Sequence, residues 1–168
     1  TETLLRFVTL CLDEEAGGIF YSIQAASHRF HTEEEYARFG EPYDRRILEA
    51  AIARSKLVIV HCHGDELMFE RLARLPGHAW NWDDRAAGPS LREGKARVKG
   101  AVIGGVNQWA TVCEGTAEEV RAEVHDAVTQ TDGIGLIVGP GCVLPPAAPD
   151  QNVAALVKAL GGKLGLVL

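Results

Sequence analysis

Residues 56–65 read KLVIVHCHGD, and the rest of the chain is organised around this stretch. Leu57–Val60 are apolar and largely β-branched, which is typical of a buried strand. The closing Gly-Asp pair predicts a turn that ends the strand. His61 and His63 stand two residues apart, and alternate side chains of a strand point to the same face. We therefore expect both imidazoles on one face, with Cys62 on the opposite, helix-facing side.

The place of these two histidines in the chain bears on their role. In α/β proteins the carboxyl ends of parallel strands carry the active sites, and His61 and His63 stand at such an end. The alternative is that they are ordinary core or surface histidines. The stretch thus predicts a candidate pair of ligands to one bound group, with that alternative open.

The amino-acid composition and net charge exclude some classes of function for this chain. The chain has 168 residues, of which 46% are hydrophobic and 24% charged, so residues 1–168 are expected to form one globular domain. The net charge of −6, without a basic cluster, argues against nucleic acid and against an anionic membrane as partners. The four cysteines lie far apart and no apolar run reaches transmembrane length, so a reducing cytoplasm is expected.

Apolar spacing and helix caps predict an alternating order of elements. Strands are expected at residues 19–23, 56–63, 77–82, 98–105 and 133–138. Helices are expected to begin at Glu2, Thr32, Glu66, Ser90, Thr116 and Pro149, with a break at Gly40–Pro42 in the second. One helix followed by five strand–helix repeats indicates an α/β fold with parallel strands and outer helices. Five strands do not close the usual eight-stranded barrel, so the sheet is either open or part of one.

Six segments between residues 19 and 160 carry a family resemblance. They read FYSIQAASHRFHTEEEYARFGEPY (20–43), VIVHCHGDE (58–66), WNWDDR (80–85), VIGGVN (102–107), CEGTAEEVRAEV (113–124) and LIVGPGCVLPPAAPDQNVAAL (136–156). Together they resemble the C-terminal half of the uroporphyrinogen decarboxylase superfamily, and the last segment is the most specific. The resemblance implies about the last five strands of a (β/α)₈ TIM barrel. The family's N-terminal half, with its arginine-bearing substrate motif, has no counterpart, so we expect a chain truncated on that side.

One branch of this superfamily transfers methyl groups between a corrinoid and a thiol. The resemblance places that branch's zinc motif on His61, His63 and Cys142, with His63 standing where the family more often has Cys. Imidazole and thiolate are both good zinc ligands, so the exchange preserves three ligands and an open fourth position. Zinc there would hold a substrate thiol as its thiolate. The resemblance implies a corrinoid as methyl donor, either free or carried by a corrinoid protein, and a small thiol as acceptor. Taken alone, Cys142 is better explained as a small buried apolar residue, and only its combination with His61 and His63 favours a metal ligand.

The other branch decarboxylates the acetate side chains of uroporphyrinogen without a cofactor. Ser22 matches a family serine that contacts the tetrapyrrole's carboxylates, whereas the histidine of true decarboxylases falls on Pro140. The candidate catalytic residues are Ser22, Asn81 and Asp83, and the candidate substrate-binding residues are Tyr21, Gln24, His28 and Arg85. The alternative for the loop residues is a solvated surface, and Asp83 with Arg85 would then be a surface ion pair.

A third possibility is a non-catalytic half-barrel. A sheet cut from a barrel has two unpaired edges and an uncovered apolar face. We therefore expect a symmetric homodimer or a missing N-terminal partner, with residues 19–23 and 134–138 at the exposed edges.

Overall fold

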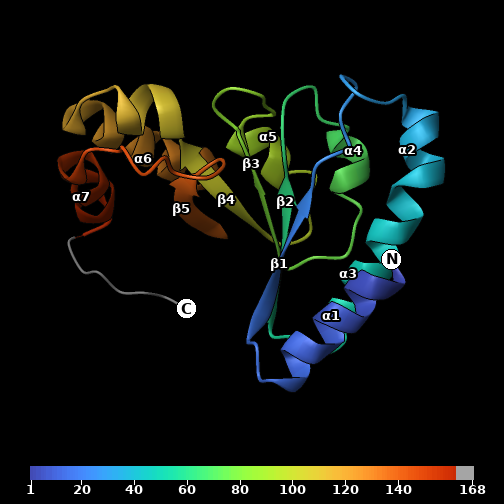
Figure 1. Cartoon of the computed structure of the whole chain (residues 1–168). Coiled ribbons are helices and arrows are strands. Elements are labelled where there is room, and N and C mark those ends of the chain that lie inside the picture. The colour runs from blue at the N-terminus through green and yellow to red at the C-terminus, as the bar shows by residue number, and fades with distance from the viewer. Residues whose placement is uncertain (162–168) are drawn as a thin grey trace.

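The computed structural model describes residues 1–161, which form a five-stranded parallel sheet with flanking helices (Figure 1). The strands are β1 (Gly18–Ile23), β2 (Leu57–Cys62), β3 (Ala79–Trp82), β4 (Ala101–Val106) and β5 (Leu136–Pro140). They lie in the order β1-β2-β3-β4-β5, and each neighbouring pair is parallel. The predicted α/β architecture is confirmed, and β1 and β5 form the sheet edges as expected.

Helices cover one face of this sheet. They are α1 (Glu2–Asp13), α2 (Glu33–Phe39), α3 (Glu41–Ile52), α4 (Phe69–Leu72), α5 (Leu91–Lys95), the π-helix η1 (Gln108–Cys113), α6 (Ala117–Thr131) and α7 (Asp150–Ala159). Helix α3 lies against β1 and β2, α5 against β4, and α6 against β4 and β5, while α7 packs on α6 (Figure 1). Within residues 1–161, none of the helices combines the length and the apolar character needed to cross a bilayer.

The sequence-predicted caps define several helix ends. Thr32 accepts a hydrogen bond from the backbone N–H of Glu35, whose carboxylate accepts from the N–H of Thr32 in return. Thr116 and Glu119 repeat this arrangement at the start of α6. Each pair satisfies backbone donors that a helix start leaves free. The predicted break at residues 40–42 also occurs, because α2 ends at Phe39 and α3 begins at Glu41.

The largest difference from the predicted elements concerns the helix expected over residues 66–74. Only α4, a single turn over Phe69–Leu72, is helical. The residues before it pair instead with the loop after β1: the N–H of His28 donates to the carbonyl of Glu66, and that of Met68 donates to the carbonyl of Ala26. Glu66 adopts a φ of 48°, outside the helical region. Tertiary pairing therefore overrides local helix propensity here.

Other parts of the chain also differ from the sequence-based expectation: β3 begins at Ala79 and β4 at Ala101, where strands were expected from residues 77 and 98. The last strand starts at Leu136 rather than Gly133, because Gly133 and Gly135 have φ values of 65° and 61° that extended backbone does not adopt. The π-helix η1 was not predicted. It begins where the Asn107 side chain accepts hydrogen bonds from the N–H groups of Trp109 and Ala110.

The family-like segment at residues 149–153 has a structural role. Asn152, at the start of α7, is fully buried, and its side-chain amide donates to the carbonyls of Val112 and Gly115 at 3.0 and 2.8 Å. These bonds tie α7 to the end of η1.

The two faces of the sheet differ in their covering. On the helix-covered face, Val58, Val60 and Cys62 are fully buried, which confirms the expected direction of Cys62. On the opposite face, which we call the open face, apolar side chains remain in contact with solvent: Phe20 is 59% exposed and Ile137 48%. His61 alternates with Val60 and Cys62 and therefore lies on the open face.

Candidate metal centre

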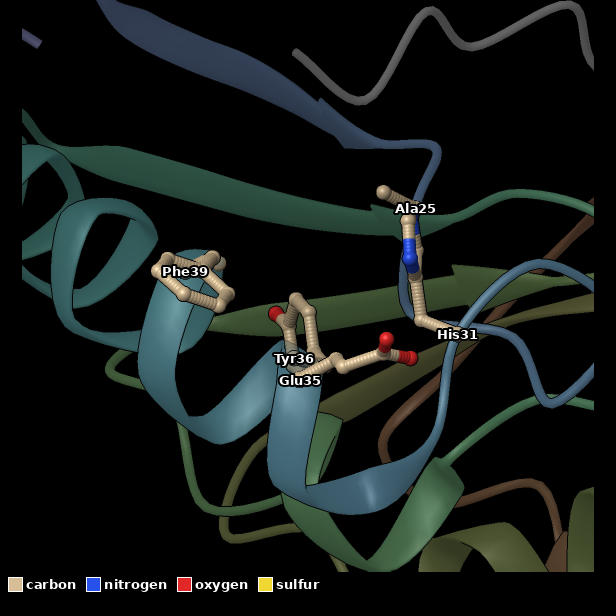
Figure 2. Close-up of a pocket in the computed structure, with 6 residues that line it drawn as sticks. Ala25, His31, Glu35, Tyr36 and Phe39 are labelled. Atoms are coloured by element: carbon tan, nitrogen blue, oxygen red, sulfur yellow. The ribbon is translucent and has the colours of Figure 1, made fainter.

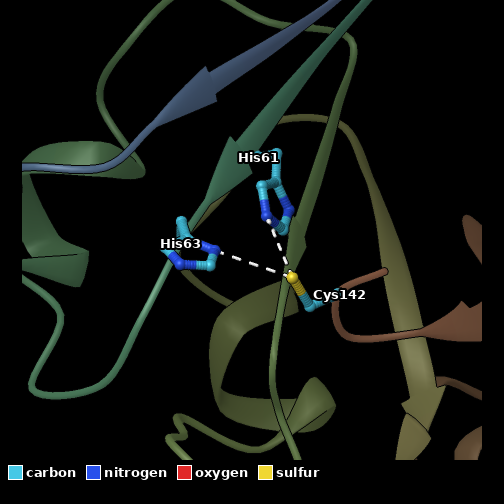
Figure 3. A group of neighbouring side chains, drawn as sticks. All are labelled: His61, His63 and Cys142. Carbon is cyan, nitrogen blue, oxygen red and sulfur yellow. Dashed lines mark hydrogen bonds between the residues drawn. The ribbon is translucent and has the colours of Figure 1, made fainter. Parts of the chain in front are cut away.

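Three side chains predicted from the sequence to share a ligand converge at the carboxyl end of the sheet (Figure 3). His61 lies in β2, His63 directly follows it, and Cys142 is two residues beyond β5. The Cys142 Sγ lies 3.7 Å from His61 Nε2 and 3.6 Å from His63 Nδ1. The structure thus brings these three residues together, and binding of a metal by them stays a prediction.

The distances suit one metal ion. Zinc–nitrogen bonds of about 2.05 Å and a zinc–sulfur bond of about 2.3 Å, at a tetrahedral angle of about 109°, place nitrogen and sulfur about 3.6 Å apart. The two observed separations, 3.7 and 3.6 Å, match this value. Imidazole nitrogen and thiolate sulfur are both ligands that zinc binds in proteins. Both nitrogen–sulfur separations therefore suit a shared zinc ion, and the three ligand atoms all lie within 4.8 Å of one another.

Asn81 orients the His61 ring. Its amide nitrogen donates to the carbonyls of Ile103 and Pro140 at 3.0 and 3.2 Å, so its Oδ1 faces His61 as an acceptor. His61 Nδ1 lies 2.6 Å from this oxygen and donates its proton to it. The lone pair of His61 is then on Nε2, the atom that faces Cys142.

Burial supports the neutral form of this histidine. The His61 side chain is 5% exposed, and burial, with a smaller contribution from the neighbouring His63, lowers the pKa of His61 below its ordinary value. Phe20 stacks on the ring, with the two ring centroids 5.3 Å apart. A neutral imidazole with a fixed tautomer is ready to act as a ligand at neutral pH.

Gly141 allows the chain after β5 to bring Cys142 to the histidines. A Cβ at this position would lie 2.4 Å from the Cα of Asp83 and 2.8 Å from the carbonyl oxygen of Trp82. Both are backbone atoms, so only glycine permits this close approach to the end of β3. The corresponding atom at Gly139 would have ordinary contacts, the nearest at 3.9 Å.

A cavity of about 320 Å³ adjoins the three candidate ligands. Asp83 lies in its wall, and its carboxylate accepts hydrogen bonds from Gln108 Nε2 at 2.7 Å and from the N–H of Ala86 at 3.0 Å. Trp109, 60% exposed, also lines it. Sequence reasoning did not select Gln108 or Trp109. Their position in the sequence could have indicated them, because they follow Asn107 directly after β4, at the same end of the sheet as the histidines.

The remaining residues proposed from the sequence separate into near and distant groups. Ser22 is exposed on the open face in register with His61, and Gln24 donates to its hydroxyl at 3.3 Å. Tyr21 points to the other face, where its hydroxyl donates to Asp44 at 2.7 Å, because alternation along β1 reverses its direction. The structure therefore does not bring Tyr21 to the candidate metal centre.

Arg85 and His28 also have other contacts. The Arg85 guanidinium donates to the carbonyl of Gly105 at 2.7 and 2.9 Å and pairs with Asp126 at 2.6 Å, which ties the end of β3 to α6. His28 is exposed and lies 3.6 Å from Glu33.

A second cavity, of about 380 Å³, lies on the helix side between α2 and the loop after β1 (Figure 2). Two of its polar side chains already serve the structure: Glu35 completes the cap of α2, and the Tyr36 hydroxyl donates to Asp44. This cavity therefore has fewer polar side chains available to bind a ligand than the cavity beside the candidate metal centre.

Comparisons with known proteins agree with this fold. The family model described as uroporphyrinogen decarboxylase (URO-D) matches residues 1–162. Among solved structures, a methyltransferase from Methanosarcina mazei has a TM-score of 0.81 at 20% sequence identity. The match covers 94% of this chain and 45% of that one, so the chain spans less than half the length of the solved protein. No curated protein matches the chain. The five strands thus correspond to part of a TIM barrel.

Proposed function

Because the chain belongs to the uroporphyrinogen decarboxylase family, we propose that it is a zinc-dependent, methyltransferase-like member that activates a thiol. The observation that carries the proposal is the convergence of His61 Nε2, His63 Nδ1 and Cys142 Sγ at separations suited to one zinc ion. The similarity in fold to a methyltransferase supports the same choice.

The side chains of the candidate centre have separate roles in this proposal. His61 and His63 are neutral donors, and Cys142 is the anionic one. Asn81 holds the His61 ring by its Nδ1–H, as outer ligands of zinc histidines commonly do. Zinc, when bound, acts as a Lewis acid that favours the thiolate form of a substrate thiol. Three protein ligands leave one position for that sulfur.

The methyl donor is proposed to be a corrinoid. The substrate thiolate supplies the electron pair for the new carbon–sulfur bond, and the methyl group leaves cobalt without the electrons of the broken bond. The thiol proton is released to solvent when the thiolate forms. Transfer therefore requires a deprotonated sulfur and needs no further oxidant or reductant.

The test compares zinc-loaded and metal-stripped protein with methylcobalamin and a simple thiol, and measures the methyl thioether by mass spectrometry. The proposal predicts zinc-dependent thioether that is lost in Cys142→Ala and kept in Cys62→Ala. Equal thioether formation with and without zinc contradicts it.

Decarboxylation of uroporphyrinogen or a related carboxylate is the alternative, and the exposed Ser22 beside His61 favours it. Against it, the described lining of the cavity holds Asp65 and Asp83 but no lysine or arginine. Such a wall repels a polycarboxylate. Release of CO₂ from uroporphyrinogen by metal-stripped protein would favour this alternative over methyl transfer.

A further inference from the structure

The cavity beside the candidate metal centre has an acidic wall. Its charged side chains, apart from the histidines, are Asp65 and Asp83, and the lining that the structure describes includes no lysine or arginine. The carboxylates of this lining favour a cationic group on a ligand over an anionic one, beside the positive charge that a bound zinc ion would add at the histidines.

The two carboxylates differ in how far their charge is compensated. Asp65 pairs with the Arg29 guanidinium at 2.6 Å. Asp83 forms no ion pair within residues 1–161, and its two hydrogen bonds come from neutral groups, the Gln108 amide and the Ala86 N–H. Because each carboxylate oxygen accepts more than one hydrogen bond, Asp83 can still bind a cationic donor.

Asp83 is also held in position in the cavity that the candidate ligands line. It follows Asn81, the partner of His61, by two residues, and its backbone contacts Gly141, the neighbour of Cys142. Gln108, only 3% exposed, restrains the carboxylate from one side. The exposed Trp109 adds an aromatic surface in the same cavity, and aromatic faces attract cations.

From these observations we propose that the methyl acceptor is a short aminothiol, a thiol that carries a cationic ammonium group, and that Asp83 binds this ammonium. The inference rests on the proposed function, because it assigns the class of the thiol. An anionic thiol would face Asp83 with like charge, and a neutral thiol would lack the charge-assisted hydrogen bond. The charge-assisted bond favours the aminothiol over a neutral thiol by about tenfold or more.

The experiment uses cobalt(II)-loaded protein, whose thiolate-to-metal absorption reports binding of a thiol without turnover. Three thiols of similar size are titrated: 2-aminoethanethiol, 2-mercaptoethanol and 2-mercaptoethanesulfonate. Affinities are referred to the thiolate concentration at the working pH, which removes the difference in the thiols' own acidity. The expected order is aminothiol, neutral thiol, sulfonate thiol, with at least tenfold between the first and the last.

Variants separate the role of Asp83 from general charge. Asp83→Asn keeps the size of the side chain and should reduce the preference for the aminothiol to less than about threefold, with little change for the neutral thiol. Asp132→Asn, at the C-terminal cap of α6 before β5 begins, lies toward the amino ends of the strands, away from the candidate metal centre. It changes the net charge equally and should keep the preference.

The outcomes distinguish this inference from the function on which it rests. Equal affinity for the three thiols, or an unchanged preference in Asp83→Asn, overturns the assignment of an aminothiol and leaves thiol activation standing. Absence of a thiolate band with every thiol overturns thiol activation, and the aminothiol assignment with it.

Discussion

The side-chain amide of Asn81 has three hydrogen-bond partners, Ile103, Pro140 and His61, and the most consequential is His61. Replacement by alanine removes the acceptor at 2.6 Å from His61 Nδ1 and frees the ring to rotate or change tautomer. We expect Asn81→Ala to lower zinc affinity by about 10–100-fold, as loss of such outer partners does. Competition with a chelator measures the affinity. Gln24→Ala, on the exposed loop after β1, serves as a control, and an unchanged affinity in folded Asn81→Ala would contradict the proposed role.

Asp84 provides a pH-dependent prediction. Asp84 as a residue is 8% exposed, and burial raises the pKa of its carboxyl group from 3.8 to about 6. Asp84 thus binds its proton more tightly in the folded than in the unfolded chain, so its contribution to stability is greatest below pH 3.8 and is lost as the pH rises through about 6.

The Asp84→Asn variant tests this sign. Across that pH range the free energy of unfolding of the variant should rise relative to the wild type by on the order of 3 kcal/mol. Denaturant titrations at several pH values measure the difference. A difference that does not change with pH would show that Asp84 is not the responsible group.

Among single residues, the three candidate metal ligands could be predicted from the sequence more completely than the residues that line the cavity beside them. Alternation along β2 separates His61 from Cys62, and the family resemblance adds Cys142, so these three could be selected before the fold was known. Tyr21 shows the limit, because its strand position, one residue before Ser22, directs it to the helix side. Gln108 could not be selected as a cavity residue, because it lies in a π-helix and this kind of helix has no regular spacing of apolar residues by which a sequence would reveal it.

Among elements, the end of β5 is the most sensitive to substitution. Gly141→Ala would place a methyl group 2.4 Å from the Asp83 backbone, so the segment that carries Cys142 must move. We expect zinc affinity to fall at least about tenfold. Gly139→Ala is the matched control, because its added atom has 3.9 Å of clearance and should leave the affinity nearly unchanged. Equal affinities of the two variants would show that Gly141 does not position Cys142.

Element boundaries were predictable where local chemistry decides them. The capping boxes at Thr32 and Thr116 define helix starts through side-chain hydrogen bonds that a sequence can reveal. The length of helix α4 was overestimated, because residues 64–68 pair with the distant loop after β1. This pairing includes an antiparallel bridge between Ser27 and Leu67. Such long-range pairing leaves no periodic signal in the segment itself.

At the scale of the whole molecule, the open face leaves apolar side chains in contact with solvent. Phe20, Leu57 and Ile137 remain 59%, 38% and 48% exposed on it, and among residues 1–161 no further strand pairs with the outer edges of β1 and β5. We propose that a second copy of the chain, or a further strand-bearing segment, covers this face, because burial of apolar surface stabilises association. Sedimentation at micromolar concentration should show a dimer or a tendency to aggregate. A stable monomer with cooperative thermal unfolding would contradict this proposal.

The zinc affinity of two cysteine variants tests the central claim most directly. Cys142 faces His61 and His63, whereas Cys62, in the same strand as His61, is fully buried on the helix-covered face. We predict one zinc per chain in the wild type, a loss of affinity of more than about 100-fold in Cys142→Ala, and a change of less than about threefold in Cys62→Ala. Equal effects of the two substitutions, or a wild type that retains no zinc, would contradict a zinc site formed by His61, His63 and Cys142.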